Sequence, residues 1–219
     1  MALTITEKIT TLLKLISEPK IFSTLISFRG FGYLLEKGWF NSFKSGEPID
    51  AELKPIPWFT YSAIDFLKDR LNLNLNIMEF GSGNSTLFFA ERVKKVYSLE
   101  HDKIWIQKIY SKLPQNVELN STSSASAEDY LHPVVEREKY DIIIVDGLFR
   151  NECIKAGLNC ISDVGIIILD DSERIEYSEG IKFIVQKGFK QINFTGIAPG
   201  IFFNKCTSIF YKSNNCLKI

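Results

Sequence analysis

Short apolar runs alternate with amphipathic segments over most of the chain. The runs are four to six residues long and rich in β-branched side chains, which is typical of buried strands, whereas apolar residues in the intervening segments recur three and four positions apart, as in helices. The predicted strands cover residues 75–80, 96–99, 117–120, 140–145, 166–169, 191–195 and 206–211, of which 117–120 and 191–195 are more polar than the others. This alternation predicts an α/β protein with helices on both faces of a mostly parallel sheet.

Two features of these runs indicate where strands lie in the sheet. Residues 142–145 read Ile-Ile-Ile-Val, and an uninterrupted β-branched run indicates a central strand buried on both faces. The last two predicted strands, 191–195 and 206–211, are separated by a short connection that contains Pro199-Gly200. Such a connection predicts an antiparallel pair at one edge of the sheet.

A helical extension is expected before this domain. Thr4 and Glu7 have the spacing of a capping box, and the helix they open carries one apolar stripe of Ile5, Ile9, Leu12, Leu13 and Ile16. A second, mostly helical piece covers 21–35, while 38–57 contains three prolines and reads as irregular. We therefore predict an extension over residues 1–57 and a main domain over 58–219. A stripe of this kind most often packs on its own domain; a lid, an arm that joins a homo-oligomer, and a peripheral membrane contact through residues 1–40 stay open.

The first strand of the main domain ends in a glycine bend. The sequence Glu79-Phe80-Gly81-Ser82-Gly83 joins it to a helix, and the next strand ends on Glu100. Gly81 and Gly83 allow positive φ and close approach of a ligand to the backbone. Glu100, about 20 residues after the bend, can accept hydrogen bonds from both hydroxyls of a ribose. In open parallel sheets, ligands bind beside the carboxyl ends of the strands, where this bend and this acid meet.

The pattern disfavours a dinucleotide, because Thr86 stands where the dinucleotide fingerprint needs its third glycine. The bend resembles motif I of the class I S-adenosylmethionine-dependent methyltransferases, with Ser85 in place of that family's usual next glycine. The resemblance extends from about Trp58 to Ser213. It implies a three-layer α/β/α sandwich with a seven-stranded sheet of order 3-2-1-4-5-7-6 and an antiparallel strand 7. It also implies S-adenosylmethionine as the cofactor.

The resemblance assigns a set of cofactor-binding residues, namely Glu79, Gly81, Ser82, Gly83, Ser85, Thr86, Glu100, His101, Ser126, Ala127 and Asp146. Trp58 and Tyr61 are candidates to cover the cofactor, and Tyr61 also to contact the substrate; aromatic packing between helix and sheet is the alternative. His101 either crosses the adenine ring or is solvated. Ser126 either meets the adenine edge or only caps a helix.

Three aspartates are expected at the ends of the fourth and fifth strands: Asp146, Asp170 and Asp171. Transfer of a methyl group to a hydroxyl needs alignment and removal of a proton, so Asp146 or Asp171 is a candidate general base. Catechol-type O-methyltransferases have similar acids, and this similarity implies a divalent cation, Mg or Ca, held by the three aspartates. The alternative is a site without metal. Arg150 and Arg174 are candidates to bind an anionic group of the substrate; a surface salt bridge is the commoner alternative.

Composition narrows the choice of partner. Lys and Arg together number 26, as do Asp and Glu, so no global charge attracts nucleic acid. Asp146-Gly147-Leu148-Phe149 also lacks the Asn/Asp-Pro-Pro-aromatic motif of enzymes that methylate amino groups of bases. The four cysteines form no C-x-x-C pair, which favours a reducing compartment such as the cytoplasm. No apolar run approaches the ~20 residues that cross a bilayer.

The sequence therefore predicts an S-adenosylmethionine-dependent methyltransferase that methylates a hydroxyl of a small molecule, such as a sugar or a phenol. Two alternatives stay open: an NAD-linked oxidoreductase, and a binding or assembly module that keeps the fold without turnover.

Overall fold

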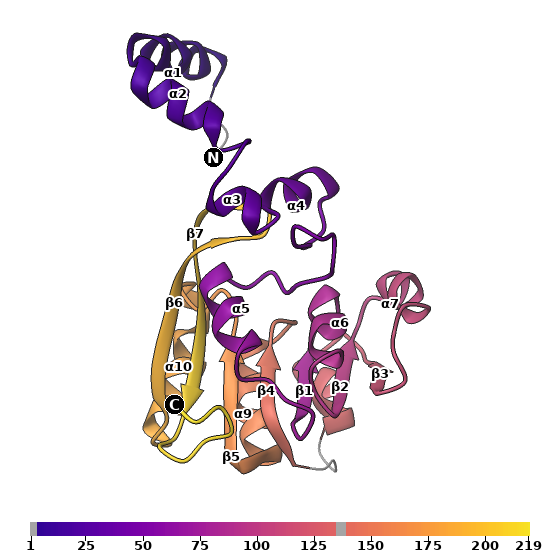
Figure 1. Cartoon of the computed structure of the whole chain (residues 1–219). Helices are drawn as coiled ribbons and strands as arrows, with labels where there is room; N and C mark the ends of the chain where they lie inside the picture. Colours follow the sequence, from indigo (N-terminus) through magenta and orange to yellow (C-terminus); the bar gives the residue numbers. More distant parts are fainter. Residues whose placement is uncertain (1–3, 135–138) are drawn as a thin grey trace.

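A computed structural model describes residues 4–134 and 139–219, which form one seven-stranded sheet with helices on both faces (Figure 1). The strands are β1 (Asn76–Phe80), β2 (Lys95–Glu100), β3 (Val117–Ser121), β4 (Tyr140–Val145), β5 (Ile161–Leu169), β6 (Lys190–Ala198) and β7 (Ile201–Tyr211). Their order is β3-β2-β1-β4-β5-β7-β6. The first five are parallel and β7 runs antiparallel to both β5 and β6, so the predicted fold class and strand order are confirmed.

The period of two in β4 sends successive side chains into two separate cores. Ile142 and Ile144 face the cluster built with α5 (Tyr61–Lys68) and α6 (Asn84–Ala90). Ile143 and Val145 face the cluster built with the helices of the other layer. Those helices are α8 (Ala127–Leu131), α9 (Arg150–Cys160) and α10 (Ser178–Gln186). Burial on both faces explains why this strand is apolar at every position.

One further helix and two 3-10 turns complete the described part of the main domain. They are α7 (Lys103–Tyr110), which follows β2, and the 3-10 turns η1 (His132–Val134) and η2 (Ile175–Tyr177). Asp102 caps α7 by accepting from the backbone N–H groups of Ile104 and Trp105 at 2.8 and 3.1 Å.

The N-terminal part divides into two pieces. Helices α1 (Ile5–Ser17) and α2 (Pro19–Ser27) extend from the body, and neither contains a buried residue (Figure 1). The capping box at Thr4 and Glu7 is confirmed, with both reciprocal hydrogen bonds formed. Packing of the apolar stripe on the domain, the commonest arrangement for such a stripe, is not what the structure shows. Residues 1–3 of the predicted extension lie outside the described residues.

The second piece contacts the body. It comprises α3 (Tyr33–Glu36), α4 (Trp39–Ser45) and the segment up to 57. The interpretation of 38–57 as wholly irregular is wrong, because Gly38 in a left-handed conformation starts α4 and Gly46 ends it. Trp39 fixes this helix by donating its indole N–H to the carbonyl of Ile201 at 3.0 Å.

Candidate active site at the carboxyl ends of the strands

The glycine bend is held against the loop after β4. Gly81 has φ of 91°, and a Cβ at this position would lie 2.9 Å from the Cα of Gly147. Gly81 is thus required both by its positive φ and by the close approach of two loops. Gly83 has an extended φ of −179°, so it does not use the positive φ that a glycine allows. A Cβ on Gly83 would meet no atom closer than 3.9 Å, which leaves room for a ligand beside the backbone.

Glu79 fixes the bend from below. Its side chain is fully buried, and it accepts hydrogen bonds from the hydroxyls of Ser85, Thr86 and Ser98 at 2.5, 2.5 and 3.0 Å. The Thr86 hydroxyl in turn accepts from the backbone N–H of Gly83 at 2.9 Å, and the Ser98 hydroxyl lies 2.7 Å from that of Ser82. Two hydroxyl bridges therefore connect Glu79 to the bend. Burial outweighs these bonds and raises the pKa of Glu79 to about 7.

Glu100 points at the same bend from β2. Its Oε2 accepts from the backbone N–H of Ser82 at 3.0 Å. Its Oε1 accepts from the backbone N–H groups of His101 and Asp102 at 2.8 and 2.9 Å, and it also lies 2.9 Å from His101 Nδ1. A carboxylate has about four acceptor positions, so Oε2 keeps capacity for a further donor. The carboxylate at the end of β2 and the glycine bend are thus directly connected, in agreement with the prediction that this acid and this bend meet.

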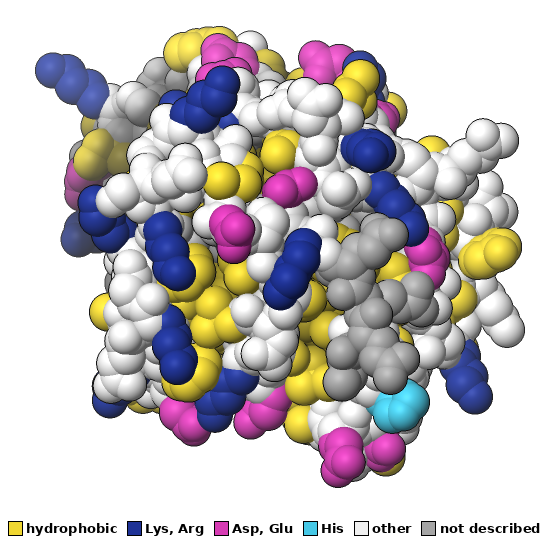
Figure 2. Space-filling model, turned by 90° about the horizontal axis from the view of Figure 1, so that it is seen from below, with side chains coloured by type: hydrophobic (Ala, Val, Ile, Leu, Met, Phe, Trp, Pro, Cys, Tyr) yellow, Lys and Arg dark blue, Asp and Glu magenta, His cyan; other side chains and the backbone are white. Residues whose placement is uncertain are grey.

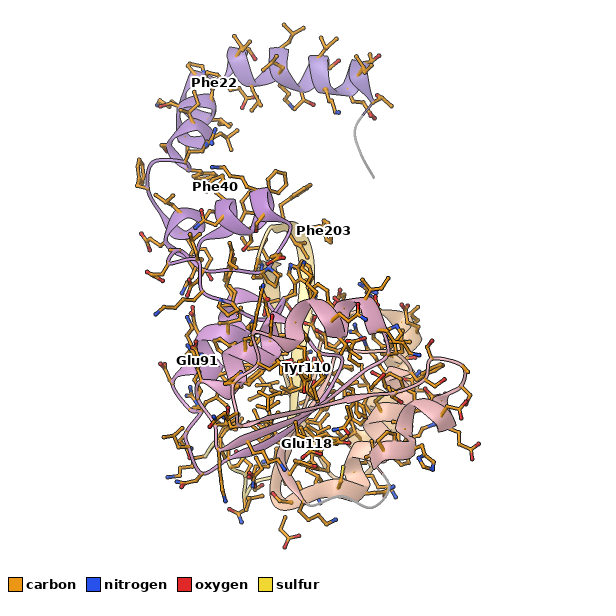
Figure 3. The ribbon with its side chains drawn as sticks, turned by 90° about the vertical axis from the view of Figure 1, so that its right-hand side faces the viewer. Phe22, Phe40, Glu91, Tyr110, Glu118 and Phe203 are labelled. Carbon is orange, nitrogen blue, oxygen red and sulfur yellow. The ribbon has the colours of Figure 1, made fainter. Side chains whose placement is uncertain are left out.

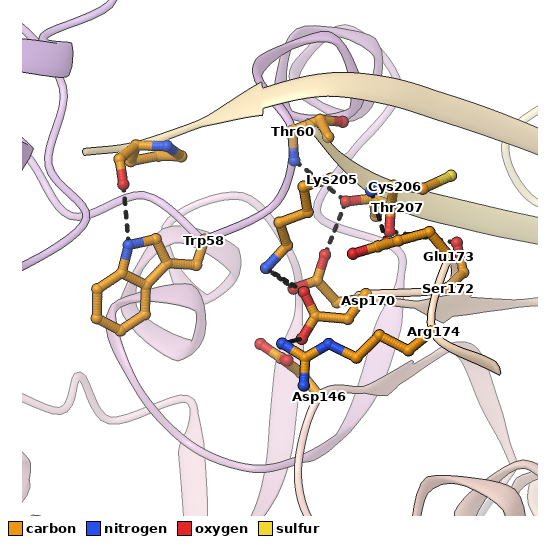
Figure 4. Close-up of polar contacts among 12 residues, drawn as sticks. Trp58, Thr60, Asp146, Asp170, Ser172, Glu173, Arg174, Lys205, Cys206 and Thr207 are labelled. Atoms are coloured by element: carbon orange, nitrogen blue, oxygen red, sulfur yellow. Dashed lines mark hydrogen bonds and ion pairs between the residues drawn. The ribbon is translucent and has the colours of Figure 1, made fainter. Parts of the chain in front are cut away.

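A cavity of about 700 Å³ opens beside this pair. Ligand sites typically enclose about 300–1,000 Å³, so the volume suits a nucleoside-sized ligand together with an acceptor. Ten of the residues selected from the sequence line it: Gly81, Ser82, Gly83, Ser85, Glu100, His101, Asp146, Arg150, Asp170 and Asp171. Trp58 also lines it and is fixed by donating its indole N–H to the carbonyl of Pro199 at 3.0 Å (Figure 4).

Lys205 on β7 neutralises two of the aspartates at the floor of the cavity (Figure 4). Its Nζ lies 2.6 Å from Asp170 Oδ2 and 2.8 Å from Asp171 Oδ1, and all three side chains are buried. Asp170 Oδ1 accepts from the hydroxyl of Thr207 at 2.8 Å. The end of β5 and the antiparallel strand β7 are therefore joined by a buried ion pair.

Two arginines complete this charge balance. Arg150 Nη2 lies 2.9 Å from Asp146 Oδ1, and Arg150 Nη1 donates to the carbonyl of Asp170 at 2.6 Å. Arg174 Nη2 lies 2.8 Å from Asp171 Oδ2. Arg150 also donates from Nε to the carbonyl of Gly147 at 3.1 Å. Its guanidinium joins the β4 and β5 loops, and the structure does not leave it free to bind a substrate anion.

The donor set at this position does not suit a divalent cation. Ammonium and guanidinium groups already contact Asp146, Asp170 and Asp171, and Lys205 lies between the two neighbouring carboxylates. Over residues 4–134 and 139–219, no group of His, Cys, Asp or Glu is arranged to hold a metal ion. The predicted Mg or Ca site is thus not supported, because Lys205 supplies the positive charge that the carboxylates need.

The three aspartates differ in their electrostatics. Burial and the nearby charge of Asp146 raise the pKa of Asp170 to about 7. Burial also raises the pKa of Asp146, against the opposing effect of Arg150. Burial acts on Asp171 too, but the hydrogen bond and charge of Lys205 and the two arginines outweigh it and lower its pKa. Asp171, with φ of 53°, is one of four non-glycine residues of positive φ among those described, and Phe149 at the β4 loop is another. Such backbone strain is concentrated at functional sites.

Other selected residues lie away from the cavity. Tyr61 is buried in the core, with its ring edge-on to Tyr33 at 5.9 Å, so the structure does not bring it to a substrate position. Ser126 caps α8 by accepting from the Asp129 N–H at 3.1 Å, and neither it nor Ala127 lines the cavity. Glu79 and Thr86 are likewise buried behind the bend.

Sequence reasoning missed several residues of the site. Lys205 stands immediately before the run predicted as the last strand, and β7 begins four positions earlier than this lysine, at Ile201. Trp105 on α7 donates its indole N–H to the carbonyl of Ser82 at 2.7 Å. Glu47, in the segment after α4, lies 2.9 Å from Lys108 Nζ at the cavity wall. A lysine beside an apolar strand is the one signal that the sequence offers for these contacts.

Comparisons with known proteins give matches in structure only. No family model and no curated protein matches the sequence. A putative O-methyltransferase from Klebsiella pneumoniae is similar with a TM-score of 0.53 and 18% identity, covering 86% of this chain and 94% of that one. The N-methyltransferase NodS from Bradyrhizobium japonicum, in complex with S-adenosyl-L-homocysteine, is similar with a TM-score of 0.52 and 12% identity, and the match covers 82% of this chain and 99% of that one. A precorrin-6y C5,15-methyltransferase from Geobacter metallireducens is similar with a TM-score of 0.52 and 16% identity, and the match covers 68% of this chain and 87% of that one.

At these identities the likeness concerns the fold. The strand order and the reversed β7 agree with it, and the predicted resemblance is confirmed at that level. The chain has the fold of the class I S-adenosylmethionine-dependent methyltransferases.

Proposed function

We propose that the protein is an S-adenosylmethionine-dependent methyltransferase that methylates a hydroxyl of a small molecule such as a sugar or a phenol. One observation carries the proposal: Glu100 Oε2 and the Ser82 N–H meet at 3.0 Å at the wall of a 700 Å³ cavity that extends to Asp146. A carboxylate beside a partly exposed glycine backbone suits a ribose next to an amino-acid moiety. The complex of NodS with S-adenosyl-L-homocysteine, in the same fold, supports this choice of cofactor.

The residues present fit this cofactor. Glu100 Oε2 has a free acceptor position for a ribose hydroxyl, and the open side of Gly83 admits a ligand beside the backbone. His101 lines the cavity next to Glu100, which supports a contact between its ring and the adenine. The bound cofactor supplies an activated methyl group on a sulfonium.

Asp146 is the best-placed group to accept the proton of the acceptor hydroxyl. It lines the cavity, its Oδ1 is oriented by Arg150 at 2.9 Å, and burial raises its pKa toward the range useful for a base. Asp171 is paired with three cations and has a lowered pKa, so it suits positioning better than proton transfer. The acceptor would then lie between Asp146 and the methyl group.

Isothermal titration with S-adenosylmethionine tests the first step, and NADH is the comparison ligand. We expect heat with the former only; heat with NADH alone would favour an oxidoreductase. A panel of sugars and phenols then tests turnover. Asp146→Asn should lower kcat by about 10²–10⁴-fold while the cofactor still binds, since that is the usual contribution of a general base. Cofactor binding without methylation of any acceptor would favour a binding module.

The pH profile adds a second check on Asp146. Its pKa is raised, so kcat should fall as the pH drops through that value and the base becomes protonated. The residual activity of Asp146→Asn should not show this fall in kcat at low pH. If kcat of the variant fell at low pH in the same way, the pH dependence would belong to another group.

A further inference from the structure

The apolar stripes of α1 and α2 have no partner within the described part of the chain. Both helices are amphipathic, yet their large apolar side chains are exposed; Leu13, for example, is 64% exposed. Figure 3 shows the two helices standing clear of the sheet, with Phe22 of α2 near the corner where α1 meets α2. A monomer in water gains nothing by displaying such a surface, so a binding partner is indicated.

A second apolar element lies at the same end of the molecule. The hairpin of β6 and β7 extends beyond the sheet, and its tip carries Phe202 and Phe203, which are 73% and 63% exposed. Their rings meet edge to face at 5.8 Å. The hydrogen bond from Trp39 to the carbonyl of Ile201 holds the tip against α4. Figure 3 shows Phe203 on the side of the body from which the two helices project.

The charge of this part of the chain is uneven. Residues 4–45 contain six Lys or Arg and only three Glu, although the charges of the whole chain balance. Lys8, Lys14, Lys20 and Arg29 make no ion pair with any residue in the described ranges. At the opposite end, shown in Figure 2, basic and acidic side chains are interspersed. Excess positive charge next to an apolar stripe is the combination that binds anionic lipid.

We propose that these elements form a membrane-docking surface, defined as the exposed apolar side chains of α1 and α2 together with Phe202 and Phe203. Its partner is the headgroup region of an anionic bilayer, with the apolar side chains buried at the boundary of headgroups and acyl chains. The surface spans two helices and a separate hairpin tip, and a fluid lipid layer accommodates such discontinuous elements. In a symmetric dimer the same positive patch would face itself, which is unfavourable. No helix among residues 4–134 and 139–219 is long and apolar enough to cross a membrane.

The location of the surface has a consequence for the cavity. Ile201, which precedes Phe202, lines the cavity, as does Pro48 in the segment after α4. The rim of the cavity and the docking surface therefore adjoin. Docking would hold the cavity next to the lipid headgroups, where an acceptor attached to a lipid or partitioned into the membrane is concentrated.

Vesicle co-flotation of the full chain tests the proposal directly. Vesicles of phosphatidylcholine with phosphatidylglycerol should carry the protein upward, and vesicles of phosphatidylcholine alone should carry much less. Salt should weaken binding, because the screening length falls from about 10 Å at 0.1 M to about 3 Å at 1 M. Lys14→Gln with Lys20→Gln should lower binding to the anionic vesicles by roughly fivefold per lysine.

Polar replacements of the apolar residues distinguish insertion into the bilayer from electrostatic attraction to it. Leu12→Gln with Ile16→Gln, and separately Phe202→Ser with Phe203→Ser, should each weaken partitioning by more than about tenfold. The matched control is Ile175→Gln, since Ile175 is 83% exposed but lies on η2, outside the docking surface. It should bind vesicles like the wild type. None of α1 or α2 is buried, so helix content and thermal midpoint should be unchanged.

Two results would overturn the proposal. One is failure of the wild-type protein to float with either vesicle. The other is self-association, seen by sedimentation, that the Leu12→Gln and Ile16→Gln changes abolish while vesicle binding is absent; a second copy of the chain would then cover the surface. Neither result depends on S-adenosylmethionine, so the proposed activity is tested separately.

Discussion

Glu79→Gln should change how the stability of the protein depends on pH. The Glu79 carboxyl has no solvent exposure, and burial raises its pKa from 4.5 to about 7 despite three hydrogen bonds from hydroxyls. The folded protein therefore holds this proton more tightly than the unfolded chain does. A pKa difference of this size corresponds to about 3 kcal/mol in the free energy of unfolding.

The direction follows from the protonation of the two states. Below pH 4.5 both states carry the proton, and the stabilisation from the raised pKa is fully present. As the pH rises from 4.5 to 7, the unfolded chain loses its proton first, so the free energy of unfolding of the wild type decreases. A glutamine does not titrate. Relative to the wild type, the Glu79→Gln variant should therefore gain about 3 kcal/mol across this interval.

Urea unfolding at a series of pH values, followed by tryptophan fluorescence, measures this difference. Asp170, whose pKa is also raised to about 7, titrates in the same interval, but it is present in both proteins and largely cancels. Altered hydrogen bonds to Ser85 and Thr86 add an offset that does not vary with pH. A difference that stays constant from pH 4.5 to 8 would show that the hydroxyls keep Glu79 ionised, and the argument from burial would be refuted.

Three further changes test the site. Glu100→Ala should weaken binding of S-adenosylmethionine by at least about 10- to 100-fold in calorimetry, since one charge-assisted hydrogen bond is worth about 1.5–3 kcal/mol, whereas Glu91→Ala on the surface should not. Gly81→Ala should be far more destabilising in thermal melts than Gly188→Ala; both have positive φ, but only the former Cβ meets backbone, at 2.9 Å. Lys205→Met should lower the free energy of unfolding by about 3–5 kcal/mol in urea titrations, because it leaves buried aspartates unpaired; a loss below about 1 kcal/mol would contradict the ion-pair assignment.

Local pattern was sufficient to predict the sheet. The apolar run of β4 and the glycine bend after β1 are determined by neighbouring residues, and each of the seven predicted strands is present within a few positions. The ends of a strand were harder to predict from the sequence where burial changes along the strand. β7 starts at Ile201 although residues 202–204 are exposed, because pairing with β6 rather than burial maintains the strand there.

The contacts of the site depended on residues far apart in the chain. Glu100 could be placed beside the bend because adjacent parallel strands end at one edge. Tyr61 could not be excluded from the cavity, since an aromatic residue at a helix start faces either core or ligand according to how that helix docks. The three hydroxyls around Glu79 come from α6 and β2, so the sequence identified the acid but not its role beneath the bend.

The same limit explains the metal prediction. Three aspartates at two strand ends look alike in sequence whether a metal ion or basic side chains neutralise them. The basic side chain that pairs with two of them is Lys205 on β7, 34 positions beyond Asp171. Lys205 arrives there only because β7 is inserted antiparallel beside β5. With Arg150 and Arg174 it gives three cations for three carboxylates. A divalent ion would have to displace a buried ammonium from two carboxylates, so the residues at this floor do not fit a metal site.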